Sequence, residues 1–424
     1  ITPSKNWGAV HVRRSGPFFL PPPYASPGAP PADKTAHIVC CSEFFFVKSQ
    51  VSLVLRNWEQ TMCAVLEHEE ELYPLPIYEP PALYAFVGHG SAVQCIRRIS
   101  GTPLWKEAPR WPAQARMLPV FGDCVCNQRA FKKLASEVKL ERYGIDSRPV
   151  DLLVPDRRMR SQGKGAKFHP WTHVTFPHAF VRVHENLLVS RPELVIVQLC
   201  GAHAKLDGLF DGFIASLRAE EEARAAFGVE GDKPTVENPV KWENRRRLVE
   251  AAVLACEFAG RYRLSGTGCG VDFDASPVMT LASLAEVLEA LGSRGYSQAV
   301  HRAQKVRELA FDGSASPMET SLVLLLTLPL EFGGFGLPRP RLNAPVDVSV
   351  SGGQMTVTPD FLWREQRVAL EYDSDEFHVN KGREQAGRDA LRANALLAGG
   401  YRVFRATTQM ARTLEGVAVL AGQL

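Results

Sequence analysis

Three carboxylates and one imidazole lie close together near the end of the sequence. They belong to Asp360, Glu371, Asp373 and His378. A hard divalent cation such as Mg²⁺ binds oxygen ligands, typically one or two carboxylates together with waters and substrate phosphate. A cation bound there could activate water and stabilise the charge that develops on a scissile phosphate. The residue types therefore indicate a nuclease-like site in which Asp360, Glu371 and Asp373 bind Mg²⁺ or Mn²⁺.

A β-hairpin is the element that would gather these acids. Residues 357–363 and 367–373 are both β-prone, and the residues that join them are polar, which favours an antiparallel hairpin. An even-numbered turn pairs Trp363 with Val368. The same register extends along both strands and decides which side chains share a face.

In this register Asp360 lies opposite Glu371, and directly opposed residues share a face of the sheet. Because side chains alternate along a strand, Asp373 points the same way as Glu371, and the other face is apolar. Like charges opposed across a sheet are destabilising. A solvated surface would explain each acid alone, whereas a bound cation would explain the set.

The acids stand within a longer pattern of motifs. Its members are Pro359-Asp360, Glu371-Tyr372-Asp373, His378, Arg388-Asp389-x-x-Arg392 and the run from Gly400 to Arg405. From about Ser314 to Leu424, the chain resembles the very-short-patch-repair-endonuclease-like domains of bacterial proteins. These domains belong to the PD-(D/E)-x-K restriction-endonuclease-like superfamily. The resemblance implies an α/β/α core with a central mixed sheet and a Mg²⁺-dependent endodeoxyribonuclease activity.

The family pattern also has a glutamate on the helix before the hairpin, and Glu319 matches it. Ser316 and Glu319, with Pro317 at the first helical position, also form a capping box. The two roles are compatible, so Glu319 is both a candidate cap and a candidate member of the acidic site.

One residue departs from the superfamily pattern. A lysine often follows two residues after the glutamate, and Asp373 stands in that place. A lysine can orient water and balance charge, whereas a second carboxylate cannot, so the identity of the general base is open. His378 is the best remaining proton acceptor, and the resemblance suggests that a histidine there takes part in the site. A lone histidine is more often structural.

Two groups of cations are candidates for contact with DNA phosphates. They are Lys381, Arg388 and Arg392 around the helix that follows the hairpin, and Arg157, Arg158, Arg160 and Lys164 in a glycine-containing loop. A solvated surface is the alternative for each. The formal net charge of +3 is too small to indicate nucleic-acid binding. From Phe311 onward the chain has 11 Lys/Arg against 13 Asp/Glu, so DNA contact would depend on local patches.

The length of 424 residues and the 45% hydrophobic content predict an α/β protein of two or three domains. We expect a disordered proline-rich leader over 1–34 and a small N-terminal module over 35–120 that could bind DNA. An α/β and then helical middle region would follow over 121–310. The endonuclease-like domain would occupy 311–424. The N-terminal and middle regions would be α+β in character.

Composition excludes several other classes. The nine cysteines, with Cys40-Cys41 and Cys124-x-Cys126 as the only close pairs, make neither a disulfide framework nor a zinc signature. The chain contains no run of 18 or more apolar residues, so no membrane span is expected. A reducing cytoplasm is the expected compartment. Gly266-x-Gly268-x-Gly270 lacks the lysine and hydroxyl residue of a phosphate-binding loop, so no nucleotide cofactor is expected. The histidines at 169, 173, 178 and 184 fit no zinc pattern.

The middle region suggests an alternative function. We expect strands over 149–155 and 181–189 and an apolar helix over 194–200. Together with Val154-Pro155, Arg182-Val183-His184 and Ser190-Arg191-Pro192-Glu193, this order resembles regulators similar to abortive-infection antitoxins, joined to a nuclease-like domain. The chain would then be a DNA-binding regulator whose nuclease-like domain is catalytically inactive. The first expectation remains an endonuclease that acts in DNA repair, mobile-element biology or defence. To cut both strands of DNA, such an enzyme would need to form a homodimer or to make two successive nicks.

Overall fold

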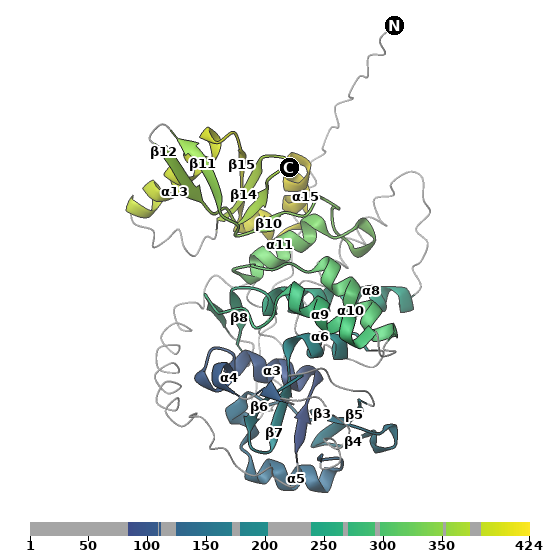
Figure 1. Ribbon diagram of the computed structural model, residues 1–424. Helices are drawn as coiled ribbons and strands as arrows, with labels where there is room; N and C mark the ends of the chain where they lie inside the picture. Colours follow the sequence, from purple (N-terminus) through teal and green to yellow (C-terminus); the bar gives the residue numbers. More distant parts are fainter. Residues whose placement is uncertain are drawn as a thin grey trace, which may run out of the picture. The chain divides into compact units, whose positions relative to one another are not determined.

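The computed structural model describes most of the chain from residue 84 onward (Figure 1). The described ranges are 84–108, 110–111, 124–171, 179–201, 239–265, 270–292, 297–350, 353–373 and 383–424. All of them belong to the second of the two units into which the chain divides, Val39–Leu424. The predicted leader, most of the predicted N-terminal module, His378 and Lys381 lie outside the described residues.

The first described part contains a seven-stranded mixed sheet in the order β2-β6-β7-β1-β3-β5-β4. The strands are β1 (Ala85–Val87), β2 (Arg110–Trp111), β3 (Val150–Val154), β4 (Ser161–Gln162), β5 (Ala166–Pro170), β6 (Phe180–His184) and β7 (Leu187–Ser190). β1 pairs in parallel with β7 and antiparallel with β3. The predicted boundary at residue 120 therefore falls inside this sheet, because strands from both sides of it pair with one another.

The strand predicted over 149–155 is present as β3, whereas 181–189 forms a hairpin. β6 and β7 pair antiparallel around a turn at Glu185 and Asn186. Both strands are largely buried. The prediction of one strand over 181–189 is therefore wrong, because the polar pair Glu185-Asn186 forms a two-residue turn between two strands.

Four helices belong to this part of the chain, among the residues described. They are α3 (His89–Ile99), α4 (Pro103–Glu107), α5 (Gln128–Glu137) and α6 (Pro192–Leu199), with 3₁₀ turns η3 (Leu140–Tyr143) and η4 (Arg157–Met159). α3 packs on β3 and β7, and α6 packs on α3. Ala92, Val93, Ile96 and Ile99 are buried at helical spacing, which gives α3 an apolar stripe toward the sheet.

A helical segment follows, with one small hairpin. Its elements are α8 (Pro239–Phe258), β8 (Tyr262–Leu264), β9 (Val271–Phe273), α9 (Leu281–Gly292) and α10 (Ser297–Leu309). α6 contacts α8, α9 and α10. Arg97 of α3 forms a buried ion pair with Glu257 of α8 at 2.6 Å. Separation of α3 from α8 would leave both charges buried and unpaired, which is costly. The ion pair therefore stabilises the contact between these two helices.

The last part contains the sheet that carries the predicted acids. Its elements are α11 (Pro317–Thr327), η5 (Leu330–Phe332), β10 (Arg341–Leu342), β11 (Val346–Val350), β12 (Gly353–Val357), β13 (Phe361–Trp363), β14 (Val368–Asp373), α13 (Arg383–Ala398), β15 (Arg402–Thr407), α14 (Thr408–Ala411) and α15 (Leu414–Gln423). The sheet has the order β10-β13-β14-β15, and β11 pairs with β12 in a separate hairpin. β13 and β14 are antiparallel, whereas β14 and β15 are parallel and connected through α13.

Both faces of this sheet pack against apolar residues. Phe361 and Leu370 belong to the large core that includes residues of α11 and α15. Leu362 and Ala369 belong to a smaller core with Leu396 of α13. The prediction of one apolar and one acidic face is therefore wrong for most of the hairpin. A parallel pair needs a crossover connection, and the crossover helix covers the second face.

The chain ends in two short helices. α14 ends at Ala411 and α15 begins at Leu414. Between them, the Thr413 hydroxyl accepts a hydrogen bond from the backbone N–H of Gly416 at 3.1 Å, which caps the second helix. The expectation of an α/β protein is met in its coarse form, since mixed sheets pack against helices. Within the described ranges, no helix is both long and apolar enough to cross a bilayer.

Candidate active site

The β13–β14 hairpin has the register that the sequence predicts. Trp363 lies opposite Val368 and Phe361 opposite Leu370. Asp360 directly precedes β13, and Glu371 follows Leu370 in β14. The backbone N–H of the following residue, Tyr372, donates a hydrogen bond to Oδ2 of Asp360 at 2.7 Å. The Asp360 carboxylate is therefore held against the end of β14, which is the strand that carries Glu371.

Glu319 approaches this site from the first turn of α11. The Ser316 hydroxyl accepts from the backbone N–H of Glu319 at 3.1 Å and donates to its Oε1 at 3.0 Å. Oε2 accepts from the backbone N–H of Ala315 at 2.9 Å. The predicted capping box is confirmed, and it buries the Glu319 side chain in a fixed orientation.

The charge of Asp360 acts on both glutamates. Burial, together with the negative charge of Asp360, raises the pKa of Glu319 to about 7. Burial raises the pKa of Glu371 to about 7 as well, with Asp360 and then Asp373 contributing. Carboxyl groups that share a site repel one another's ionised forms. Acids from α11, β14 and the segment before β13 thus share one electrostatic environment.

Two arginines face the acids from neighbouring elements. Nη2 of Arg392 on α13 lies 3.5 Å from Oε2 of Glu371 and donates to the Thr358 carbonyl at 2.7 Å. Nη1 of Arg405 on β15 lies 3.2 Å from Oδ2 of Asp373. The structure therefore places Arg392, a predicted DNA contact, beside an acid, and it places Asp373, a predicted metal ligand, against a cation. Arg388 is exposed on α13.

Asn343 is a residue of this site that sequence reasoning missed. It follows β10 and has a left-handed backbone, with φ of 46°. Its backbone N–H donates to the carbonyl of Asp360 at 3.0 Å, and its Nδ2 donates to Oε2 of Glu319 at 2.7 Å and to the carbonyl of Gly313 at 3.1 Å. It thereby contacts two of the predicted acids. The sequence offers only one signal, since asparagine tolerates this backbone region better than most residues.

The donor set can be compared with the needs of a Mg²⁺ ion. Among the residues that the structure describes, no group of three or more His, Cys, Asp and Glu side chains is arranged to hold a metal. Mg²⁺ usually takes only one or two carboxylates and completes its shell with water and phosphate. Asp360 and Glu371 supply hard oxygen atoms, and burial and then the negative charge of Asp360 raise the pKa of Glu371. These two carboxylates are ligands of the type and number that Mg²⁺ commonly takes, whereas Asp373 is paired with Arg405.

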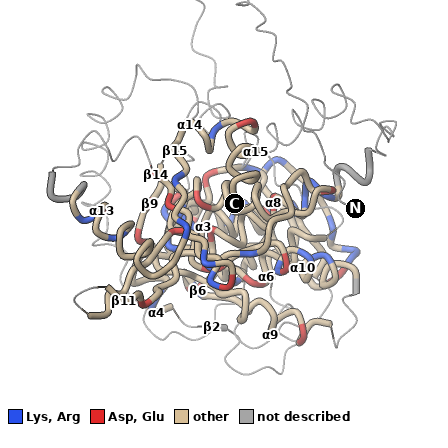
Figure 2. Tube along the Cα trace, turned by 90° about the horizontal axis from the view of Figure 1, so that it is seen from above, with Lys and Arg blue, Asp and Glu red and all other residues tan. Residues whose placement is uncertain are grey.

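The predicted basic loop belongs to the seven-stranded sheet, whereas the acids belong to the sheet β10-β13-β14-β15 and its flanking segments. Arg157, Arg158, Arg160 and Lys164 are all exposed between β3 and β5. Arg158 forms an ion pair with Asp156 at 2.6 Å. Elsewhere, basic and acidic positions are interspersed along the described chain (Figure 2). The exposure of this loop suits contact with an extended polyanion.

A histidine cluster in the first sheet was not expected. Nε2 of His169 on β5 lies 2.7 Å from Oδ1 of Asp151 on β3, and the rings of His169 and His89 stack with centroids 3.9 Å apart. Burial, and then the neighbouring His169, lower the pKa of His89 to about 3, so its imidazole is neutral. Burial alone would raise the pKa of Asp151, but the hydrogen bond with His169 and the nearby His89, His169 and Lys167 side chains lower it.

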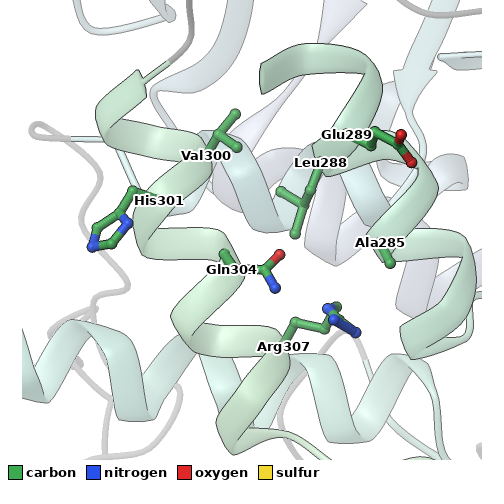
Figure 3. Close-up of a pocket in the computed structure, with 7 residues that line it drawn as sticks. All are labelled: Ala285, Leu288, Glu289, Val300, His301, Gln304 and Arg307. Carbon is green, nitrogen blue, oxygen red and sulfur yellow. The ribbon is translucent and has the colours of Figure 1, made fainter. Parts of the chain in front are cut away.

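A shallow groove of about 430 Å³ lies between α9 and α10. Side chains from both helices line it (Figure 3), namely Ala285, Leu288, Glu289, Val300, His301, Gln304 and Arg307. It contains a single carboxylate among mostly apolar and neutral groups. The groove therefore lacks the paired acids that make the β13–β14 end the better candidate for phosphodiester chemistry.

Comparisons with known proteins add no relative to this picture. No protein-family model matches the chain, and no curated protein or solved structure is significantly similar to it. A functional proposal therefore depends on the residues and on their geometry.

Proposed function

We propose that this protein is a metal-dependent endodeoxyribonuclease, which hydrolyses DNA phosphodiester bonds in repair, mobile-element biology or defence. One observation carries the proposal. Glu319, Asp360 and Glu371 come from three separate segments, and burial and then the negative charge of Asp360 raise the pKa of both glutamates to about 7. Such perturbed acids cluster at functional sites more often than at structural ones.

The arrangement of elements supports the same proposal. Helices pack on both faces of a mixed sheet, and α13 joins the parallel strands β14 and β15. A restriction-endonuclease-like α/β/α core, implied by the resemblance of residues 314–424 to repair endonucleases, would have this plan. The acids lie at the end of an antiparallel pair next to the parallel strand, where the DNA backbone could reach them.

In the proposed site, Asp360 and Glu371 would hold Mg²⁺ or Mn²⁺, which would lower the pKa of water and neutralise phosphate charge. Glu319 would complete the acidic site from the first turn of α11, where burial and then the negative charge of Asp360 raise the pKa of its carboxyl to about 7. His378 remains a proposed participant from the sequence.

Cations would serve two different purposes in the proposed enzyme. Arg392 would balance the charge of Glu371 in a chain that has Asp373 where a lysine is common. A guanidinium stays protonated, so Arg392 would balance charge without acting as a base. The exposed cations Arg157, Arg158, Arg160, Lys164 and Arg388 would bind DNA phosphates, and Lys381 remains a proposed DNA contact from the sequence.

Nicking of supercoiled plasmid DNA tests this proposal. We expect the parent protein to nick with Mg²⁺ or Mn²⁺ and to stop when EDTA is added. Asp360→Ala should abolish nicking. Asp347→Ala should leave it intact, because this exposed acid of β11 bonds Thr356, outside the site. Equal nicking by the parent protein and by Asp360→Ala would reveal a contaminating nuclease and refute the proposal.

A DNA-binding regulator of antitoxin type is the second candidate. The ion pair between Asp373 and Arg405 favours this candidate. Asp373 stands where an active superfamily member often has a lysine, and here that position holds an acid that is paired with an arginine. This candidate predicts sequence-specific binding without nicking. Gel-shift titration with the parent protein and with Asp360→Ala would give equal affinities, and neither protein would nick.

A further inference from the structure

Asn343 connects the two sides of the candidate site through three hydrogen bonds. Its backbone N–H fixes the carbonyl of Asp360, while its side-chain amide binds Glu319 at 2.7 Å and the Gly313 carbonyl at 3.1 Å. Leu342, the preceding residue, pairs with Phe361 in the sheet, so the contact to Asp360 continues the β10–β13 ladder. Asn343 therefore lies where a strand of the sheet meets the first turn of α11.

Asparagine meets two demands at this position. The backbone is left-handed, with φ of 46°, which glycine, asparagine and aspartate tolerate best. The side chain must also donate to a carboxylate that already accepts from Ala315. Glycine would satisfy only the first demand, and aspartate would add a negative charge beside Glu319. Asparagine alone of these three satisfies both.

The neutrality of the amide is also important. A lysine or arginine here would orient Glu319 but would also cancel charge in the acidic cluster, as cations do in ion pairs. An amide orients the carboxylate and leaves its charge unpaired. The acidic cluster therefore keeps its attraction for a cation while its geometry is fixed.

We infer that Asn343 is the positioning residue that holds Glu319 against Asp360 in the candidate active site. This inference rests on the proposed nuclease function. Asn343 acts through the acids, since its own bonds go to Glu319, to Gly313 and to the backbone of Asp360. Groups of this kind orient metal ligands and catalytic bases, and their loss typically costs about 10- to 100-fold in metal affinity or activity.

Two substitutions in the full-length chain separate the amide from the backbone. Asn343→Gly keeps the left-handed conformation and removes the amide. Asn343→Asp keeps the shape and the backbone tolerance but cannot donate to Glu319 when ionised. We expect both variants to fold, as judged by circular dichroism and thermal unfolding. Both should lower kcat for plasmid nicking about 10- to 100-fold and weaken Mn²⁺ binding in calorimetry, with little change in KM for DNA.

A double-mutant cycle distinguishes positioning from simple support of the fold. If Asn343 acts through Glu319, then Asn343→Gly should have little further effect on kcat in a Glu319→Gln background. Asn186→Gly, in the turn between β6 and β7, is the matched control for an asparagine-to-glycine change and should leave kcat unchanged. Independent effects of Asn343→Gly and Glu319→Gln, which multiply in the double variant, would overturn the inference.

The outcomes separate this inference from the proposed function. If the parent protein neither nicks plasmid nor binds Mn²⁺ through Asp360, both ideas fail together. If the parent protein does both and Asn343→Gly matches it in kcat and Mn²⁺ affinity, the role of Asn343 alone is refuted.

Discussion

Asp360 and Tyr372 are joined by a hydrogen bond of 2.7 Å from the backbone N–H of Tyr372 to Oδ2 of Asp360. This bond holds the Asp360 carboxylate against β14, between the positions of Glu371 and Asp373. The carboxylate cannot turn away from its neighbours without losing this bond. The repulsion that helps to raise the pKa of Glu371 is thus built into the backbone pairing of the hairpin.

A first prediction is that Glu371→Gln stabilises the protein while it abolishes nicking. The pKa of Glu371 is raised from 4.5 to about 7 in the fold. For such an acid, stability is greatest below the unfolded pKa and is lost as pH rises through the folded pKa. The neutral amide should therefore add about 1 to 2 kcal/mol at pH 8, less than the full shift implies because the group is partly solvated.

Urea unfolding in EDTA at pH 8 and pH 4 checks this first prediction. The advantage of Glu371→Gln should be present at pH 8 and absent at pH 4, where the glutamate is protonated in both states. A variant that is less stable than the parent protein at pH 8 would show that Arg392 outweighs the repulsion.

The hairpin register was predictable because it depends on local features. An even polar turn between two β-prone runs fixes that Trp363 lies opposite Val368, and the structure agrees. The capping box at Ser316 was predictable for the same reason, since its residues are three apart. Periodicity, turns and caps are properties of short segments, and they need no knowledge of distant partners.

Contacts between distant segments were not predictable from one sequence. Asn343 meets Glu319 across 24 positions, and His169 meets Asp151 through pairing of two parallel strands. The second apolar cluster behind Leu362 also depends on where α13 packs. The sequence alone does not reveal which neighbour a strand or helix will have, so side chains that act through such neighbours are missed.

A second prediction concerns His89, which is neutral and has a pKa lowered to about 3. The unfolded chain binds a proton at this residue below about pH 6.5, and the folded chain does not until about pH 3. Stability should therefore fall with decreasing pH by about 1.4 kcal/mol per unit across this window. His89→Asn should remove this contribution, and asparagine suits the left-handed backbone at φ of 50°.

The measurement for His89 is urea unfolding of the parent protein and of His89→Asn between pH 7 and pH 4. The stability difference between them should shrink as pH falls. Asp151, His169 and Lys167 also face this imidazole, so the comparison reports His89 together with its interactions with these three groups. His301→Asn, on the exposed side of α10, is the control. A difference that stays constant with pH would contradict the prediction.

A third prediction assigns Arg392 to charge balance rather than to DNA binding. Its guanidinium bridges Glu371 and the Thr358 carbonyl. Arg392→Ala should lower kcat for nicking about 10-fold and leave the salt dependence of DNA binding unchanged. Arg392→Lys should recover part of the rate, because a lysine keeps the charge but loses the two-armed geometry.

Arg388→Ala on the exposed side of the same helix is the matched comparison for Arg392. If Arg388 contacts a DNA phosphate, its loss should weaken binding and reduce the salt slope by about 1. The same salt effect in Arg392→Ala, with kcat unchanged, would show instead that Arg392 binds DNA.

A fourth prediction is that the exposed loop between β3 and β5 supplies non-specific DNA affinity. The combined variant Arg157→Ala, Arg160→Ala and Lys164→Ala removes three cations, and Arg158 is kept because it already binds Asp156. Each lost phosphate contact should reduce the slope of log affinity against log salt by about 0.9. Binding should weaken equally for unrelated sequences, and kcat at saturating DNA should not change.

Fluorescence titration of duplex DNA over a range of NaCl concentrations checks this fourth prediction. The comparison is a second triple variant, with alanine at Arg129, Lys132 and Lys133, three exposed cations of α5. It removes the same net charge from the same part of the chain. If both triple variants lose affinity equally, then overall charge and not the loop binds DNA. A loss confined to the loop variant would identify the loop as the surface that holds the phosphate backbone, because long-range attraction alone does not distinguish two patches of equal charge.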